Sequence, residues 1–341
     1  MGVDLGGIVK STKLPLEQLA GRTVAVDAYN ALYQFLASIR GEAGEHLMDS
    51  QGRVTSHLSG LFYRSINLME LGVRTVYILD GRPPALKAME IARRKIVKRE
   101  AVIKYQEAIS LGRIKEARKY AQATSVIKDY MVGDTKRILN LLGIPWIEAP
   151  SEGEATAAYL TEIGWATDVA SQDFDALLFG ARRLVRNVTV SGKRKLPGKS
   201  VYVNVEPEEM ELDRILKDLA ITREQLVDLG ILIGTDFNPD GFEDIGPTTA
   251  LKYIKTYGRL ESIPKIGEEL KKIDYKAIRE LFLRPNVGKP SDVNWREIDN
   301  DGILQFLCDE RNFSKERVRK ALQRFREVND RRSESLEKWF K

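Results

Sequence analysis

The chain has 341 residues, of which 43% are hydrophobic, and a formal net charge of +5 from 54 Lys and Arg against 49 Asp and Glu. This hydrophobic content is sufficient for a full core and excludes an intrinsically disordered chain. The single cysteine and the two histidines, His46 and His57, exclude an intramolecular disulfide, a cysteine-based zinc site and a histidine-rich metal site.

Four β-branched segments predict buried strands, and helical patterns separate the first three. The strands are expected at residues 23–27, 75–80, 167–171 and 200–205, and the helices at 28–40, 56–71, 84–142 and 152–163. Strands that alternate with helices are typical of an α/β fold with a mainly parallel central sheet flanked by helices. From about Glu208 onward the pattern predicts helices alone.

Positive charge is concentrated in three runs. Residues 81–120 hold 12 Lys and Arg against 4 Glu, residues 182–199 hold seven basic residues and no acid, and residues 311–332 are also basic. One such run is more often a solvated helix face, but three together indicate a polyanion binder. Because residues 85–130 also lack any strand signal, we expect them to form a helical insertion that projects from the sheet, with a break at Gly112.

Seven acidic residues stand where predicted strands end or helices begin. They are Asp27, Asp80, Asp173 and Asp175 after strands, Glu152 and Glu154 in the sequence PSEGEA, and Asp236 after an apolar run. Taken singly, each has an ordinary interpretation as a turn or capping residue, and Ser151 with Glu154 matches a capping box. Together, carboxylates at one edge of a parallel sheet favour Mg²⁺ or Mn²⁺, and seven suit two ions that act on a phosphodiester.

Six motifs in this order and spacing resemble the structure-specific 5′-nuclease superfamily, and in particular archaeal flap endonucleases. They are MGVDLG, AVDAYNALYQFL, YILDGRPPALK, APSEGEA, SQDFD and LIGTD, and the resemblance covers essentially the whole chain. It implies a 5′-flap endonuclease that hydrolyses a DNA phosphodiester near the base of a 5′ flap, with associated 5′–3′ exonuclease activity. The expected processes are Okazaki fragment maturation in DNA replication and base-excision repair. The resemblance also implies that the seven acids bind two Mg²⁺ ions, with Mn²⁺ as a substitute.

The same resemblance assigns roles to residues outside the acidic set. It implies that Lys87 and Arg94 are catalytic and hold the scissile phosphate, which agrees with their spacing on one helix face. It implies that Tyr33 stacks near the scissile nucleotide, that Arg40 contacts DNA, and that Gly2 lies beside the DNA near the metals. Without the resemblance, Tyr33 would be interpreted as a core residue, and Lys87 and Arg94 as part of a solvated face.

The resemblance also divides the chain into regions. These are an N-terminal nuclease region (1–98), a helical arch (85–130), an internal nuclease region (116–258), a helical C-terminal region (259–329) and a flexible tail (330–341). Residues 234–258 resemble a helix–hairpin–helix element whose backbone, at Gly234 and Gly246, binds duplex phosphates around a K⁺ ion. Asp244 replaces the usual glycine here and Thr248-Thr249 the usual basic pair, so we expect weaker attraction for phosphate, in a turn that Asp244 tolerates.

The expected partners are branched DNA with a 5′ flap and the sliding clamp, the proliferating cell nuclear antigen. The tail resembles the clamp-docking motif, with Leu336, Trp339 and Phe340 as anchors and Ser333 in place of the usual Gln. No apolar run is long enough for a membrane span, so we expect a protein of the cell interior. We also expect a monomer, located in the cytoplasm near the nucleoid if the organism is an archaeon and in the nucleus if it is a eukaryote.

Three other functions were weighed against a flap endonuclease. A 5′-exonuclease of the same superfamily is disfavoured by the clamp-like tail and the short chain. A haloacid-dehalogenase-type phosphatase needs a second Asp two residues after the first, where Asp27-Ala28-Tyr29 has none. A non-catalytic protein that binds DNA structures would not need seven acids, because they repel DNA unless metals neutralise them, and a Mg²⁺-dependent cleavage assay separates it from the nucleases.

Overall fold

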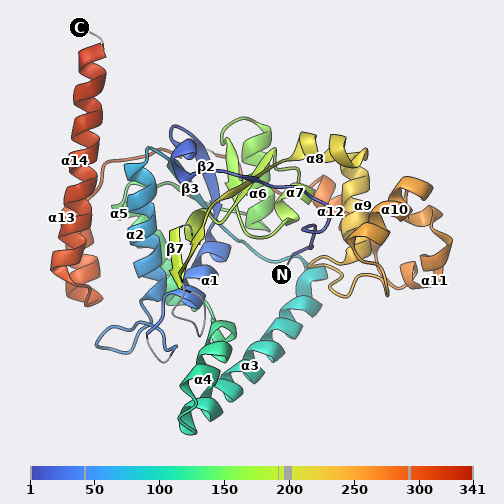
Figure 1. Ribbon diagram of the computed structural model, residues 1–341, viewed down its shortest axis with the longest axis horizontal. Helices are drawn as coiled ribbons and strands as arrows, with labels where there is room; N and C mark the ends of the chain where they lie inside the picture. The colour runs from blue at the N-terminus through green and yellow to red at the C-terminus, as the bar shows by residue number, and fades with distance from the viewer. Residues whose placement is uncertain (1, 42–43, 191, 196–201, 291–292, 340–341) are drawn as a thin grey trace.

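The fold is built on a seven-stranded sheet in the order β1-β9-β6-β5-β2-β3-β4 (Figure 1). The computed structural model describes residues 2–41, 44–190, 192–195, 202–290 and 293–339. The strands are β1 (Thr12–Lys13), β2 (Thr23–Asp27), β3 (Arg74–Leu79), β4 (Trp146–Glu148), β5 (Asp168–Ala170), β6 (Arg183–Arg186) and β9 (Glu208–Glu211). The five strands from β6 to β4 in this order run parallel, and only β9 and β1 pair antiparallel at one edge. The predicted α/β fold is therefore confirmed.

Helices cover both faces of this sheet. They are α1 (Ala28–Ser38), α2 (Ser56–Glu70), α5 (Asp129–Leu141), α6 (Gly153–Glu162), α7 (Asp175–Leu178), α8 (Leu212–Leu219), α9 (Arg223–Ile233), α10 (Pro247–Tyr257), α11 (Gly267–Leu270), α12 (Tyr275–Leu283), α13 (Asn300–Ile303) and α14 (Lys315–Trp339). Shorter helical turns are η1 (Leu16–Leu19), η2 (Ala85–Lys87), η3 (Gln122–Thr124), η4 (Val188–Val190), η5 (Leu260–Ser262), η6 (Pro264–Ile266) and η7 (Leu304–Glu310). None of the helices in the described ranges has the length and hydropathy that crossing a membrane requires.

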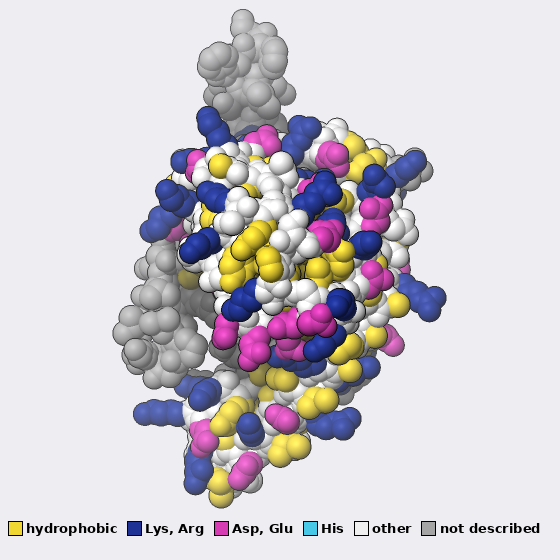
Figure 2. All heavy atoms as spheres, turned by 90° about the vertical axis from the view of Figure 1, so that its right-hand side faces the viewer, with side chains coloured by type: hydrophobic (Ala, Val, Ile, Leu, Met, Phe, Trp, Pro, Cys, Tyr) yellow, Lys and Arg dark blue, Asp and Glu magenta, His cyan; other side chains and the backbone are white. Residues whose placement is uncertain are grey.

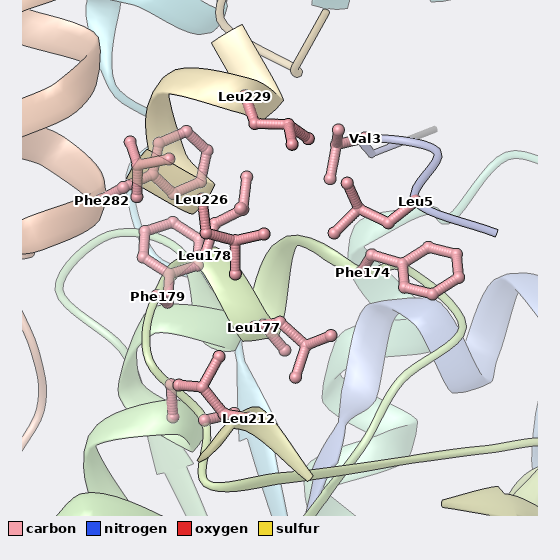
Figure 3. Packing of buried hydrophobic residues seen from close by; sticks show 14 of the residues in the cluster. Val3, Leu5, Phe174, Leu177, Leu178, Phe179, Leu212, Leu226, Leu229 and Phe282 are labelled. Carbon is pink, nitrogen blue, oxygen red and sulfur yellow. The ribbon is translucent and has the colours of Figure 1, made fainter. Parts of the chain in front are cut away.

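The sheet separates two hydrophobic cores because successive strand residues point to opposite faces. In β3, Val76 and Ile78 belong to the core beneath α6, α7 and α9, whereas Tyr77 and Leu79 belong to the core beneath α1, α2 and α5. Figure 3 shows the first core, in which Val3 of the N-terminal segment packs near Leu229 of α9. The N-terminal segment is thereby anchored beside the carboxyl ends of the parallel strands.

The segment expected as a helical insertion forms two helices, α3 (Ala88–Ser110) and α4 (Ile114–Ala121), which project from the body (Figure 1). The predicted break at Gly112 is confirmed, because this residue lies between the two helices with a φ of +67°. Only alanines are buried where α3 and α4 pack together, namely Ala101, Ala108, Ala117 and Ala121. The longer stretch predicted as helical, residues 84–142, is thus divided among η2, α3, α4, η3 and α5.

Three expectations differ from the structure. The strand predicted at 200–205 is β8 (Tyr202–Val205), which pairs with β7 (Gly192–Lys195) in a separate hairpin and not in the central sheet. Strand β9 lies at 208–211, where helix alone was predicted, because its residues are mostly Glu and carry no β-branched signal. Residues 330–339, expected as a flexible tail, continue helix α14.

The two glycines with a φ of +67°, Gly143 and Gly112, offer a matched test of backbone packing. A Cβ on Gly143 would lie 2.0 Å from the carbonyl oxygen of Arg296, whereas a Cβ on Gly112 would meet no atom within 4 Å. We expect Gly112→Ala to lower the free energy of unfolding by about 1 kcal/mol, the cost of a left-handed alanine. Gly143→Ala should lower it by a further 1–3 kcal/mol or so, because the strand-edge segment at Arg296 must shift. Denaturant unfolding of both variants measures this difference, and equal losses would contradict it.

Candidate metal centre

The structure brings all seven predicted acids to one end of the sheet. Asp27 is the last residue of β2, Asp80 follows β3, and Asp175 begins the helix that comes after β5. Because β2, β3 and β5 are neighbouring parallel strands, their carboxyl ends meet at the same edge. The other four acids lie in the segments that border this edge, namely Asp173 before α7, Glu152 and Glu154 at the start of α6, and Asp236 after α9.

Burial and mutual repulsion raise the carboxyl pKa values in one half of this group. Burial and then the charge of Asp80 hold the pKa of Asp27 well above its usual range. Burial and then the charge of Glu152 raise the pKa of Asp80 to about 6. Asp80 therefore lies close enough to both Asp27 and Glu152 for their negative charges to interact.

Burial and neighbouring negative charges also raise the pKa of Asp175 and Glu154. Burial and then the charge of Asp236 raise the pKa of Asp175 to about 7. Burial, Asp27 and then Asp175 hold the pKa of Glu154 well above its usual range, and Asp173 contributes to both shifts. The two halves are joined through Asp27 and Asp236, so the seven acids form one electrostatic unit.

Neutral donors orient five of these carboxylates, among them Asp173, which accepts from the Asn30 side-chain amide at 3.1 Å. The backbone N–H groups of Asn30, Gly153 and Val3 donate to Asp27, Asp80 and Asp175 at 3.0, 2.6 and 2.7 Å, and the Ser171 hydroxyl donates to Glu154 at 2.7 Å. The alternative interpretation of Glu154 as a capping-box residue is wrong, because α6 has no side-chain capping hydrogen bond at its N-terminus. Asp27 does cap α1 through Asn30 and also faces the other acids.

The N-terminal segment ends against this centre. Besides the hydrogen bond from Val3 to Asp175, a Cβ on Gly2 would lie 2.4 Å from the same Asp175 oxygen. Only glycine fits at position 2 without moving the carboxylate. The structure therefore places Gly2 beside the acids, where the resemblance had put it.

Lys87 and Arg94 reach into the acidic group from the base of the arch. The Lys87 ammonium lies 2.5 Å from Glu152 and 3.1 Å from Asp236, and the Arg94 guanidinium lies 2.5 Å from Asp236 and 2.7 Å from Glu90. Burial lowers the pKa of Lys87, but the charges of Glu152 and Asp236 outweigh burial and raise it above its usual value. Both cations therefore lie at the centre and not on a solvated face.

The donor set fits a hard divalent cation. Within the described ranges no three His, Cys, Asp or Glu side chains are close enough, as they stand, to hold a metal ion. Two of the acids, Glu152 and Asp236, instead pair with Lys87 and Arg94. The group nevertheless offers only oxygen ligands, which Mg²⁺ and Mn²⁺ prefer, and its raised carboxyl pKa values mark negative charge that cations would neutralise.

Tyr33 and Arg40 occupy different environments. Tyr33 is exposed, with the Lys98 ammonium 4.3 Å from its ring centroid, so its interpretation as a core residue is wrong. Arg40 is instead fixed within the protein, because its guanidinium donates to the carbonyls of Leu36 and Gly44 and to the Ser125 hydroxyl. The structure does not bring Arg40 to the acidic group.

The predicted helix–hairpin–helix element connects α9 to α10. Gly234 ends α9 with a φ of +115°, and Gly246 immediately precedes α10. Asp244 has a φ of +59°, which confirms that an aspartate adopts the left-handed turn expected here. Its neighbours Asp240 and Glu243 are exposed, as is Asp244 itself, and Figure 2 shows acidic side chains gathered on this side of the molecule just above the arch.

Two groups of residues remain to be compared with the sequence predictions, namely the expected clamp-docking residues and the neutral residues that donate to the acids. The side chains of Leu336 and Trp339, and the whole of Phe340, lie outside the described residues, so the clamp-docking motif stays a prediction. Sequence reasoning missed the neutral residues Asn30 and Ser171, which donate to the acids. Asn30 lies one helical turn after Asp27, and that spacing was the available signal.

Comparisons with known proteins find similarity to nucleases over the whole length of the chain. The XPG N-terminal domain model matches residues 1–101, and the XPG I-region model matches residues 143–236. The chain is 52% identical over 340 residues to "Flap endonuclease 1" of Nitrosopumilus maritimus, with 100% of both chains covered. Between them the two matched ranges contain all seven acids, Lys87 and Arg94.

The fold is also similar to those of solved nuclease structures. The flap endonuclease-1 of Methanococcus jannaschii superposes with a TM-score of 0.75 at 37% identity, covering 97% of this chain and 100% of that one. The catalytic core of Rad2, solved in complex with a DNA substrate, superposes with a TM-score of 0.68 at 22% identity, covering 94% and 97%, and thus shares the fold.

The raised carboxyl pKa values predict how the stability of the protein without divalent ions depends on pH. A group whose pKa is higher in the folded state stabilises fully below its unfolded pKa, and this stabilisation is lost as pH rises through the folded value. For Asp80 and Asp175 the folded values are about 6 and about 7. We therefore expect the melting temperature in chelator to fall between about pH 4 and about pH 7.

Mg²⁺ should raise the melting temperature more at the higher pH, because protons and metal compete for the same carboxylates. The variant Asp175→Asn should have a shallower pH dependence in chelator and a higher melting temperature at the alkaline end. Scanning calorimetry of both proteins tests this, and parallel pH profiles would contradict the assignment of Asp175 to the coupled group.

Proposed function

This chain belongs to the flap endonuclease 1 family and is a 5′-flap endonuclease, and we propose that it cuts DNA by two-metal-ion catalysis at the seven coupled acids. The observation that carries the proposal is that these carboxylates lie together at the carboxyl ends of adjacent parallel strands. Asp27, Asp80, Glu152, Glu154, Asp173, Asp175 and Asp236 would hold two Mg²⁺ ions, with Mn²⁺ as a substitute. Such a pair of ions supplies an activated water and stabilises the attacking and leaving oxygens at phosphorus.

The chain's own cations complete the site. Lys87 and Arg94 lie next to the acids and are held there by ion pairs with Glu152 and Asp236. With divalent ions bound to the carboxylates, these ion pairs would weaken, and Lys87 and Arg94 would be able to turn toward the scissile phosphate. A charge-assisted hydrogen bond from either cation strengthens as negative charge develops on the phosphate oxygens.

The surroundings of the centre suit a branched DNA. The single-stranded 5′ flap would pass the arch formed by α3 and α4, with the exposed ring of Tyr33 available for stacking near the scissile nucleotide. The duplex would lie against the turn between α9 and α10, where Gly234 and Gly246 bring backbone groups to the surface and a K⁺ ion would bind. Gly2 would lie beside the DNA at the metal centre, and Arg40 would contact DNA only after releasing its internal hydrogen bonds.

The wider role follows the family. We propose that the chain acts as a monomer on 5′ flaps in DNA replication and base-excision repair, in the cytoplasm of an archaeal cell. Leu336, Trp339 and Phe340 would dock on the sliding clamp, since three apolar residues at this spacing share one helix face.

Asp173→Ala tests the assignment of the acids. We expect a loss of cleavage of at least about a thousandfold, because a metal ligand supplies several kcal/mol of transition-state stabilisation. Binding of a double-flap DNA in calcium buffer should be unchanged, since the basic runs supply the grip on phosphates. Single-turnover cleavage with labelled flap DNA measures the rate, and a variant that cleaves within about tenfold of the wild type would show that Asp173 is not a ligand.

Lys87→Ala tests the phosphate contact. The rate at saturating DNA should fall much more than the affinity, because the contact is strongest in the transition state. Lys95→Ala, on the exposed side of α3, is the matched control and should change the affinity alone. If Lys87→Ala instead weakened binding and left the saturated rate intact, Lys87 would be an ordinary DNA-binding residue.

A further inference from the structure

Three neutral side chains form a hydrogen-bond chain that ends on Asp173. The Thr189 hydroxyl in η4 donates to the side-chain carbonyl of Gln34. The Gln34 amide donates to Asn30 Oδ1 at 2.9 Å, and the Asn30 amide donates to Asp173 Oδ2 at 3.1 Å. Gln34 and Asn30 lie one turn apart on α1, so a single helix carries the chain from η4 to the acidic group.

The direction of this chain is fixed by a backbone group. Asn30 Oδ1 also accepts from the backbone N–H of Gln172 at 3.3 Å. Because a backbone N–H can only donate, the oxygen of Asn30 must face Gln172, and its NH₂ group must face Asp173. The same logic turns the Gln34 NH₂ group toward Asn30 and its oxygen toward Thr189. Every donor in the chain therefore points toward the carboxylate, and successive hydrogen bonds polarise one another.

Asn30 contacts a second acid through its backbone. Its N–H donates to Asp27 Oδ1 at 3.0 Å, as the N-terminal cap of α1. One residue thus holds Asp27, at the end of β2, through its backbone and Asp173, in the segment after β5, through its side chain. Thr189, the origin of the chain, is buried, so water does not compete strongly for its hydroxyl.

We propose that Asn30 is a positioning residue for the metal centre, fixing the Asp173 carboxylate in a ligating orientation, and that Gln34 and Thr189 fix Asn30 in turn. This inference rests on the proposed function, in which Asp173 is a metal ligand. The Asn30 amide donates to Oδ2 of Asp173, so Oδ1 of the same carboxylate would be available to a cation. The hydrogen bond also restricts rotation of the Asp173 side chain, which lowers the entropy that this side chain would lose when it binds a metal ion. Partners of this kind affect metal affinity or activity by about 10- to 100-fold in known sites.

Asn30→Leu tests the proposal, because leucine has a similar volume and no hydrogen-bonding group. We expect Mn²⁺ binding by the full-length, DNA-free protein to weaken by about tenfold or more in calorimetry. The Mg²⁺ concentration at half-maximal cleavage should rise by a similar factor, while the affinity for flap DNA in calcium buffer stays unchanged. Ser38→Ala, at the exposed end of the same helix, is the control and should match the wild type. Unchanged Mn²⁺ affinity in a folded Asn30→Leu protein would overturn the proposal.

A double-mutant cycle shows whether Asn30 acts through Asp173. If it does, Asn30→Leu should cause little further loss of Mn²⁺ affinity in an Asp173→Ala background, since the oriented group is already absent. Fully additive losses would overturn the proposal. The single variant Asp173→Ala separates the two hypotheses. If it keeps metal binding and cleavage, the proposed function fails, whereas if it loses both while Asn30→Leu is silent, only the positioning role fails.

Thr189 supplies an independent measurement should Asn30→Leu fail to fold. Thr189→Val removes the hydroxyl and keeps the volume, and should weaken Mn²⁺ binding in the same direction by a smaller factor. Thr189→Ser removes the methyl group and keeps the hydroxyl, and should retain the wild-type affinity. A role in packing alone predicts the opposite order, and observing that order would overturn the hydrogen-bond chain.

Discussion

The mutual repulsion of seven carboxylates at one end of a parallel sheet is the constraint on which the rest of the structure depends. Each neighbouring element supplies something that offsets it. The N-terminal segment supplies the Val3 N–H, α6 supplies the Gly153 N–H, and the base of the arch supplies Lys87 and Arg94. These contributions come from parts of the chain that are far apart in sequence. The hydrogen bonds and ion pairs to the acidic group therefore also connect these parts to one another.

This arrangement ties the two DNA-facing elements to the centre and to each other. Arg94 pairs with Asp236, next to the turn that follows α9, and its neighbour Arg93 pairs with Asp240 in the same turn. Two ion pairs, formed by adjacent arginines of α3, thus join the arch to the helix–hairpin–helix element. The Arg93 pair is largely exposed and contributes little energy, whereas the Arg94 pair is half-buried among the acids. Divalent ions that bind the acids would therefore act on the junction of both elements at once.

The acidic group was predictable from the sequence because it depends on the topology of the sheet. Carboxylates that follow neighbouring parallel strands lie at the same edge of the sheet. The helical insertion and its break at Gly112 were predictable for the same kind of reason, since a long charged pattern without β-branched residues has no place in a sheet. The short strands β4 and β6 were not predicted, because they have three and four residues, too few to show a period. The segment at 202–205 has a strong strand pattern, but nothing in it distinguishes a local hairpin from the central sheet. Asn30 was missed because a single asparagine forms no repeating pattern, and its spacing from Asp27 was the only signal that the sequence offered. The clamp-docking tail stays a prediction.

The contact between α3 and α4, which is formed by buried alanines, determines how stable the arch is by itself. Ala101, Ala108, Ala117 and Ala121 let the two helices approach closely, but their methyl groups remove little hydrophobic surface from water. Several large apolar side chains of α3, among them Ile96 and Ile103, remain exposed. The arch therefore has little hydrophobic core of its own, and local unfolding there would leave both cores on the sheet intact. In such a nuclease the helices above the acidic group would have a lower local stability than the sheet that carries the acids.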